Sequence, residues 1–466
     1  MNKKRLFKKD ELLKKICFYK ELSSEGLNVL DGSFYVEKIK KELLEEGLIR
    51  KSSLKNTKRT AIKAGVYYKI QSYYVTPKGK RYLFEKFPEE FDKKILNIRK
   101  QNNDATERLL KKADSAIMSE ITGAYIVNKE NIMEEDCVAE ENDIQNNDYN
   151  NKLKSEIDII LDKYNNLMEM HNKTENELLK EIIKENINRG VFFSADEAKK
   201  SLALTKDDIK HYTFTALTGV LLTPAKPYCL YHAGNGFITQ TMGGEEKIAK
   251  TLIYNYVKNF DLYSDEFINL KISNAIFFCK NISAFAKLVL NKYGTKIAPG
   301  DTFDNSYIIP VSRNGCNIIK RFIKVPKYKE KLIDYLIAEY GFKKRTGYYI
   351  NALPIENSDG EAFFIGIDFD VRKFREAITF ITENLDPQCK QIIILCYAWQ
   401  QDYYEEVINL LNMDKIICQP IDEEIIDSIL GFTDRVSTVK ARKRKKPAYS
   451  KNSLHKKYLN LKASNE

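Results

Sequence analysis

Apolar residues recur at every third or fourth position in two stretches near the start of the chain. This spacing places them on one face of a helix, so helices are predicted over residues 8–21 and 34–46, with a loop between them. Ser33 precedes the second helix and is a residue type that caps free N–H groups. Gly47 follows that helix and accepts the left-handed backbone that ends many helices.

A basic ribbon is predicted after these helices. Residues 67–75, YYKIQSYYV, nearly alternate as a two-stranded ribbon does, and residues 48–51, LIRK, read as a short strand before them. Thr76 followed by Pro77 fits the start of a further helix. Helix, loop, helix and basic ribbon is the order of a winged helix, in which a helix enters the major groove of DNA and the ribbon touches phosphates. Residues 1–100 are therefore predicted to be a winged-helix DNA-binding domain.

Cationic side chains on the second helix, the loop and the ribbon are the candidates for contact with DNA phosphates. They are Lys38, Lys40, Lys41, Lys51, Lys55, Lys58, Arg59, Lys63, Lys69, Lys78, Lys80 and Arg81. Tyr68 and Tyr74 are expected to pack the ribbon onto the helices, whereas Tyr67 and Tyr73 could stack or donate to phosphate. Glutamates on the same helix, such as Glu37, would repel phosphates, so a winged helix that contacts protein is the alternative.

The centre of the chain is predicted to be a linker followed by a helix. Residues 101–150 are acidic, rich in Asn and poor in periodic apolar positions, which predicts disorder. Residues 151–187 are predicted to be helical, and within 153–183 the alternating 4-3 spacing of a heptad seam appears. The seam residues are Leu153, Ile157, Ile160, Tyr164, Leu167 and His171. This helix would either form a coiled-coil homodimer or pack on its own C-terminal domain.

Continuous apolar runs such as NAIFFCK and KQIIILCYAW alternate with helical patterns between residues 188 and 435. Strands that are apolar throughout are buried on both faces, and their alternation with helices is typical of a mostly parallel sheet. The chain is therefore predicted to be a multidomain α/β protein. The pattern leaves open whether residues 188–435 form one lobe or two.

The stretch NSDGEAFFIGIDFDV gathers the most concentrated acidic side chains of this region. Asp368 and Asp370 are two positions apart on a predicted strand and would face the same side, and Asp359 lies near the start of that strand. Restriction-like nucleases hold magnesium with acids at a strand end, but they also need a lysine two residues after the second acid. Asp370 occupies that position here. The alternative is a solvated strand end, with Asp370 favoured by the dipole of the following helix.

Charge is unevenly distributed along the chain. The formal total is +11, yet residues 1–100 carry 26 Lys and Arg against 13 Asp and Glu, and residues 437–466 carry 10 against 1. The centre is therefore acidic, and the two basic ends predict a polyanionic partner. Residues 436–466 are predicted to be a disordered basic tail that contacts nucleic acid.

The eight cysteines are scattered singly, and no CxxC pair occurs. This pattern predicts reduced thiols, not a zinc site or a disulfide framework. The sequence has no apolar run of about 18 residues, so no membrane span is expected. The basic N-terminus lacks the apolar segment of a secretory signal. These features together predict a cytoplasmic protein without a cofactor.

The combination of TPKGKRYL near residue 80 with the strand AFFIGIDFDV resembles the replication–relaxation proteins of plasmids and integrative elements in Gram-positive bacteria. The resemblance implies a winged helix followed, in many members, by a nuclease-like domain with an aromatic–aromatic–aliphatic–Glu–aliphatic–Asp strand. Phe363 to Asp368 fit that pattern, but Gly366 stands where the acid would be. The resemblance therefore implies a degenerate, non-catalytic second domain.

Residues and resemblance together predict a DNA-binding protein of a mobile genetic element. It would act in replication initiation, or in DNA relaxation and conjugation, and would assemble with replication or transfer proteins. One alternative is a magnesium-dependent nuclease that uses Asp359, Asp368 and Asp370, the only reading that needs a metal. Another alternative is a transcriptional regulator whose α/β domain senses a ligand.

Overall fold

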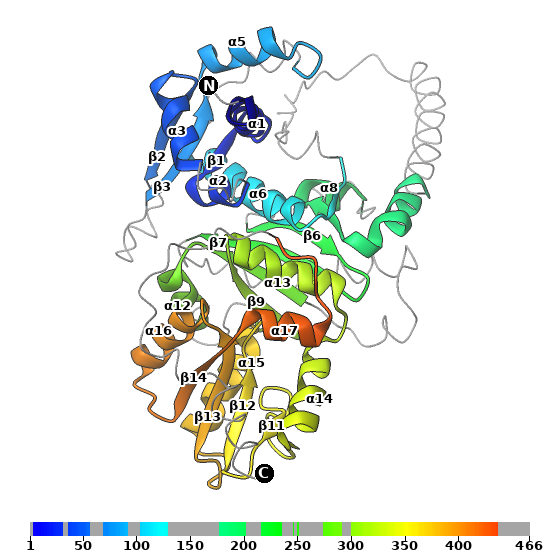
Figure 1. The fold of residues 1–466 in the computed structure, drawn as a ribbon, viewed down its shortest axis with the longest axis vertical. Helices are drawn as coiled ribbons and strands as arrows, with labels where there is room; N and C mark the ends of the chain where they lie inside the picture. The colour runs from blue at the N-terminus through cyan, green and yellow to red at the C-terminus, as the bar shows by residue number, and fades with distance from the viewer. Residues whose placement is uncertain are drawn as a thin grey trace, which may run out of the picture.

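The computed structural model describes most of the α/β region and the N-terminal helices and strands. The described residues are 3–30, 36–55, 69–91, 103–128, 177–201, 216–234, 246, 249–250, 274–290 and 300–436. Three sheets follow one another along the long axis of the molecule, with the N-terminal sheet at the top of Figure 1 and the last sheet at the bottom. No helix in the described ranges is long and apolar enough to cross a membrane.

The N-terminal unit surrounds a three-stranded antiparallel sheet with the strand order β1-β3-β2. Its elements are α1 (Lys3–Phe18), β1 (Glu21–Ser23), α2 (Ser24–Leu30), α3 (Val36–Glu45), β2 (Ile49–Lys55), β3 (Lys69–Val75) and α5 (Pro77–Lys86). The predicted helices correspond to α1 and α3. The loop expected between them contains α2, and YYKIQSYYV contributes the single strand β3, which pairs with β2.

Local signals in this unit act as the sequence predicted. The Thr76 hydroxyl accepts a hydrogen bond from the backbone N–H of Gly79 at 3.1 Å, and Pro77 is the first residue of α5. Gly47 has a φ of 68°, the left-handed backbone expected after α3. Tyr73 is 4% exposed and belongs to the core. The prediction that Tyr73 could stack on DNA is therefore wrong, because its ring lies in the core.

Helix α6 (Asn103–Ile121) occupies the first part of the predicted linker. Ala113, Ala116 and Ile117 are fully buried, and the helix packs against α2 on one side and β6 on the other. The expectation of a disordered linker is thus wrong for residues 103–128. The rest of that linker lies outside the described residues, as do the seam residues from Leu153 to His171 and the basic tail after Val436.

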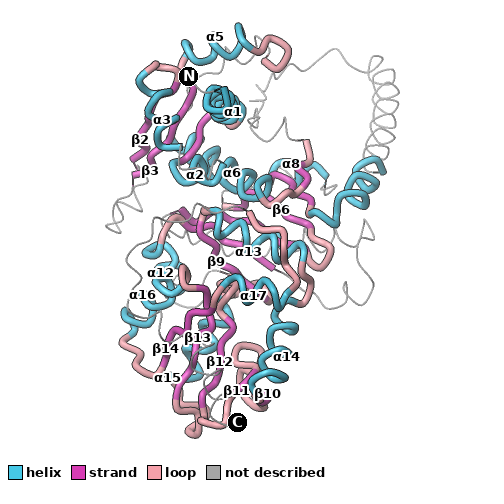
Figure 2. The backbone as a smooth tube through the Cα atoms, in the orientation of Figure 1, coloured by secondary structure: helices cyan, strands magenta, loops and turns pink. Residues whose placement is uncertain are grey.

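The second sheet has six strands in the order β4-β5-β6-β7-β8-β9 (Figure 2). The strands are β4 (Tyr125–Ile126), β5 (Val191–Ser194), β6 (Leu217–Leu222), β7 (Pro227–Gly234), β8 (Asn274–Cys279) and β9 (Asn305–Pro310). The helices of this part include α8 (Ala195–Ser201), α12 (Ile282–Leu290) and α13 (Arg313–Lys324). Residues 177–186, the end of the predicted 151–187 helix, are also helical, and a 3-10 turn, η3 (Ile187–Arg189), follows them before β5. Strands β6 and β8 are buried along their whole length, as their continuous apolar sequences predict.

The third sheet has five strands in the order β10-β11-β12-β13-β14. They are β10 (Lys343–Lys344), β11 (Ile355–Glu356), β12 (Glu361–Ile365), β13 (Gln391–Tyr397) and β14 (Ile416–Ile421). Their helices are α14 (Tyr328–Tyr340), α15 (Val371–Thr382), α16 (Gln401–Leu411) and α17 (Glu423–Leu430). The α/β prediction is confirmed at this level, with two mixed sheets in place of one mostly parallel sheet.

The two larger sheets repeat one pattern of strand pairing. Strand β6 pairs antiparallel with β5 and with β7, and β8 and β9 then add in parallel. Strands β10 to β14 follow the same succession of two antiparallel and two parallel pairings. The sheets meet where the N–H of Ile308 on β9 donates to the carbonyl of Phe369 at 3.1 Å.

Candidate functional site

The basic face of the N-terminal unit is formed by α3, β2 and the start of α5. In Figure 1, α3, β2 and β3 lie at the edge of the molecule, whereas α2 and α6 lie between them and the six-stranded sheet. Ile39 and Leu43 are fully buried and fix the inner face of α3. The opposite face of α3 is therefore turned to solvent.

The lysines of α3 are only partly available for a ligand. Lys40 pairs with Glu37 and lies 5.2 Å from the ring centre of Tyr73. Lys41 pairs with Glu45 at 3.7 Å. These are surface pairs within one helix, which contribute little to stability and exchange readily.

Lys38, Arg50, Lys51 and Arg81 are exposed and make no ion pair with any described residue. Arg50 was not among the predicted contacts, although it lies inside the predicted strand LIRK beside Lys51. Lys78 donates to the carbonyl of Glu46 at 2.9 Å.

Lys80 is half-buried, and burial lowers its pKa, with Cys17 opposing that shift. Lys80 is thus a weaker candidate than the sequence suggested. The backbones of Lys55 and Lys69 end the paired strands β2 and β3. Lys58, Arg59, Lys63, Tyr67 and Tyr68 lie outside the described residues.

The two acids of the C-terminal region lie close together but not on a strand. Strand β12 ends at Ile365, and Asp368 and Asp370 follow in a turn where Phe369 has a φ of 60°. Both side chains are 1% exposed, and both contact the Nζ of Lys329 from α14, at 2.8 Å and 3.3 Å. The prediction that the two acids share one face of a strand is therefore wrong, although Lys329 brings their side chains together. The alternative of a solvated strand end is also wrong, because both side chains are buried.

Asp370 also begins α15, as predicted for a carboxylate at a helix N-terminus. Its side chain accepts a hydrogen bond from the backbone N–H of Lys373 at 3.3 Å. The Tyr328 hydroxyl donates to Asp368. The carboxylates are thus satisfied by protein donors, which is the usual condition for burying a charge.

Asp359 does not join this pair. It is exposed in the turn before β12, separated from Asp368 by the length of that strand, about 16 Å. Glu361, at the start of β12, bonds to the side chains of Asn357 and Gln391. Within the described ranges no three His, Cys, Asp or Glu residues are grouped as a metal site would require. The structure therefore does not assemble the acids that the nuclease reading needs.

The pKa shifts near these acids favour a structural ion cluster. Burial alone would lower the pKa of Lys329, but Asp368 and Asp370 outweigh it and raise that pKa above its ordinary value. Burial raises the pKa of Tyr307 and of Tyr328. At neutral pH the lysine is an ammonium and the tyrosines are phenols, so none of the three is poised as a general base.

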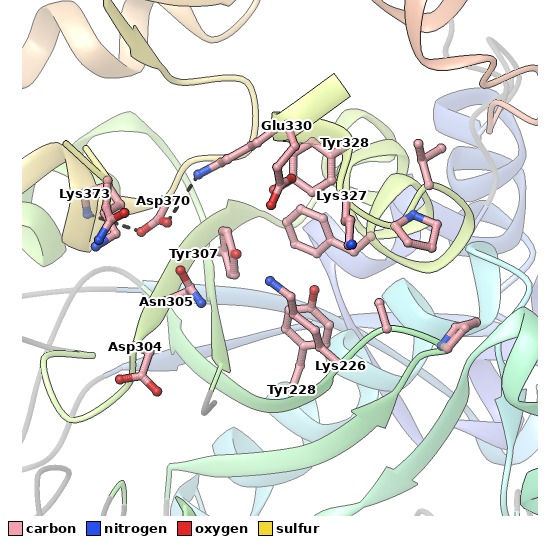
Figure 3. A pocket seen from close by; sticks show the side chains of 17 residues that line it. Lys226, Tyr228, Asp304, Asn305, Tyr307, Lys327, Tyr328, Glu330, Asp370 and Lys373 are labelled. Carbon is pink, nitrogen blue, oxygen red and sulfur yellow. Dashed lines mark hydrogen bonds and ion pairs between the residues drawn. The ribbon is translucent and has the colours of Figure 1, made fainter. Parts of the chain in front are cut away.

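A cavity of about 710 Å³ adjoins this cluster between the two larger sheets (Figure 3). Asp370 and Lys373 line one side, and the β6–β7 turn, the start of β9 and the start of α14 line the others. Its lysines were not identified from sequence. Lys226 stands in the Pro-flanked turn TPAKPY and Lys327 in VPKYKEK, patterns that signal a turn and a helix start but no ligand.

Seven cysteines fall within the described ranges, and all seven are free thiols, in keeping with the prediction of reduced cysteines. No family model, curated protein or solved structure matches the chain.

Proposed function

We propose that the chain binds duplex DNA through its N-terminal unit, used as a winged helix. The observation that carries this proposal is the succession α2, α3, β2 and β3, which ends in a ribbon with Arg50 and Lys51 exposed on β2. A helix pair followed by a basic two-stranded ribbon suits the major groove and the adjacent phosphates.

The distribution of charge on this face supports backbone contacts by the ribbon as the main source of affinity. Lys38 on α3, Arg50 and Lys51 on β2 and Arg81 on α5 are exposed cations of this face without an acidic partner among the described residues. Lys40 and Lys41 share α3 with their glutamates, so their charges are locally balanced. Phosphate contacts position a protein on DNA without reading its sequence.

The resemblance to replication–relaxation proteins supports an origin or operator of a mobile element as the target of this binding. On that proposal, proteins of replication or conjugation are the further partners. The negative charge at the centre of the chain would be repelled by DNA phosphates, so DNA would bind to the basic ends of the chain.

The proposal is tested by fluorescence anisotropy with a labelled DNA duplex. The ribbon variant carries Lys38→Gln, Arg50→Gln and Lys51→Gln. The distal variant carries Lys331→Gln, Lys343→Gln and Lys344→Gln, which removes the same charge from exposed positions on α14 and β10.

The ribbon variant is expected to bind DNA about tenfold or more weakly than the unmodified chain, because three phosphate contacts are removed. The distal variant is expected to bind as the unmodified chain does. Equal affinities of the ribbon variant and the unmodified chain would contradict the proposal and favour protein contact by this unit.

A further inference from the structure

Strand β14 is an open edge of the five-stranded sheet. It is the last strand in the order β10-β11-β12-β13-β14, and Figure 2 shows it at one side of that sheet. Its six residues, IICQPI, carry no charge, and the side chain of Ile417 is 45% exposed. An edge strand presents unpaired N–H and C=O groups to which another strand can bind, so proteins usually protect their edges.

The other edge strands that the structure describes carry such protection. Strands β1, β4 and β10 have only two or three residues, and β10 consists of two exposed lysines. Strand β2 carries Arg50, Lys51 and Lys55. Strand β9 is covered where the N–H of Ile308 donates to the carbonyl of Phe369. Among these edge strands, β14 alone is neither short, nor charged, nor bonded on its outer side to another described segment.

The hydrogen bonds to β13 determine which backbone groups of β14 face outward. The N–H of Ile392 on β13 donates to the carbonyl of Lys415 at 2.8 Å. Alternate residues of a strand in a parallel ladder bond to the same neighbour, so Ile417 and Gln419 also face β13. The residues whose backbone groups face outward are therefore Ile416, Cys418 and Pro420.

Pro420 limits how another strand can pair with this edge. Proline has no N–H, so complete pairing is restricted to Ile416 and Cys418. The N–H of Ile416 makes only a long bond, 3.5 Å, to the carbonyl of Met413. Antiparallel pairing with β14 of a second copy can set Ile416 of each copy opposite Cys418 of the other, and each such pair exchanges two hydrogen bonds. Pro420 then lies outside the hydrogen-bonded pairs.

The same register places Ile417 opposite its counterpart in the second copy. The two residues form a non-hydrogen-bonded pair, in which the Cα atoms are about 4.5 Å apart and the side chains are closest. Two exposed isoleucine side chains would thus cover each other, and no like charges would face each other within the paired strands. Helix α16 packs against β14 and ends in exposed Leu410 and Leu411, so further apolar surface lies next to the edge.

We propose that the chain forms a two-fold symmetric homodimer in which β14 pairs antiparallel with β14 of a second copy and Ile417 lies on the two-fold axis. A strand that matches its own copy in this way forms an isologous interface, and the two five-stranded sheets become one continuous sheet. The N-terminal units lie at the other end of the molecule, so both proposed DNA surfaces stay free (Figure 1). This interface is distinct from the seam predicted over residues 153–183.

The first test is sedimentation equilibrium of the full chain and of Ile417→Lys. The unmodified chain is expected to dimerise, and Ile417→Lys is expected to dimerise at least about tenfold more weakly, because like charges directly opposite in a strand pair are destabilising. Ile350→Lys is the matched control, since Ile350 is 43% exposed between β10 and β11. This control and the ribbon variant are both expected to dimerise normally, so failure of dimerisation is distinguishable from failure of DNA binding.

The second test is disulfide formation in the presence of copper phenanthroline, measured by non-reducing gel electrophoresis. Ile417→Cys is expected to form a cross-linked dimer, because Cα atoms about 4.5 Å apart suit a disulfide. Gln419→Cys is the control on the same face of β14. The proposed register separates this residue from its counterpart by four positions, about 13 Å along the strands, so it is expected to cross-link no more than the unmodified chain.

Three results would overturn the proposal. The full chain could remain monomeric at about 100 μM, a concentration at which a dimer of micromolar affinity is well populated. Ile417→Lys could dimerise as tightly as Ile350→Lys, which would place the dimer interface elsewhere. Gln419→Cys could cross-link as well as Ile417→Cys, which would exclude the proposed register.

Discussion

Lys329 contacts both Asp368 and Asp370, and these contacts limit what the two acids can do. Each carboxylate is 1% exposed and each already receives a protein donor. A magnesium ion would have to displace the ammonium of Lys329 and would find no third acid nearby within the described ranges. The contacts of Lys329 with Asp368 and Asp370 thus join α14 to the turn after β12.

Replacing Lys329 with Met is expected to destabilise the chain strongly. The change leaves two buried carboxylates without their cation, and breaking a buried pair in this way costs about 3–5 kcal/mol. Urea denaturation measures the free energy of unfolding. Lys344→Met is the matched control, because its pair with Asp334 is exposed and is worth about 0–1 kcal/mol. Similar losses in the two variants would contradict the assignment.

Cys17 gives a pH dependence of stability. Burial raises the pKa of its thiol from 9.0 to about 11, with Lys80 opposing the shift. Between these values the folded state binds the proton more tightly than the unfolded state does. The stability that comes from the raised pKa of the Cys17 thiol is therefore fully present below pH 9 and is lost as the pH rises toward 11.

The free energy of unfolding is measured by urea denaturation at pH 8 and pH 11 for the unmodified chain and for Cys17→Ala. Raising the pH from 8 to 11 is expected to lower the free energy of unfolding of the unmodified chain by about 2–3 kcal/mol more than that of Cys17→Ala, since one pKa unit corresponds to about 1.4 kcal/mol. A difference that stays constant would show that the thiol has an ordinary pKa.

At the scale of elements, α2 is held between the N-terminal sheet and the six-stranded sheet. Arg313 at the start of α13 donates to the carbonyl of Val29 at 3.0 Å and to that of Leu30 at 3.2 Å. Lys280 pairs with Glu25 at 2.9 Å. The last carbonyls of a helix lack partners within it, so Arg313 satisfies groups that would otherwise be unpaired.

Arg313→Ala is expected to lower the free energy of unfolding by about 1–3 kcal/mol, because two partly buried carbonyls lose a charged donor. Thermal and urea denaturation measure this loss. Arg50→Ala is the control, since Arg50 is exposed and unpaired among described residues. An unchanged stability for Arg313→Ala would mean that α2 does not depend on α13.

Sequence patterns predicted the elements whose signals are local. Thr76, Pro77 and Gly47 marked helix ends correctly, because capping depends on a few neighbouring residues. The helix α2 was missed because seven residues are too few to show a helical period. The helix α6 was missed because it buries charged residues, and burial of charge depends on distant partners.

Two residues of α6 illustrate this dependence. Lys112 pairs with Asp196 from α8, and Asp114 accepts from Ser23 at 2.7 Å and contacts His232 at 3.1 Å. In sequence they made the segment look like a solvated linker. The burial of Asp368 and Asp370 could not be predicted for the same reason. Their partner Lys329 lies about forty residues away in the sequence, and only the fold brings it to them.

At the scale of the whole molecule, the fold repeats one sheet pattern twice and places the N-terminal unit at one end. The alternation of apolar strands and helices predicted the α/β class but could not predict this repeat, because a strand buried on both faces carries no mark of its direction. The proposed DNA surface lies at the end formed by α3, β2 and β3, away from the five-stranded sheet (Figure 1).

The most direct test of the account is the salt dependence of duplex DNA binding by the full chain and by the ribbon variant. The logarithm of the binding constant falls linearly with the logarithm of salt concentration, by about 0.9 per phosphate contact. We expect the slope of the ribbon variant to be shallower by about 2–3, because three cations are removed. Equal slopes, or the same change in the distal variant, would place the DNA contact elsewhere on the chain.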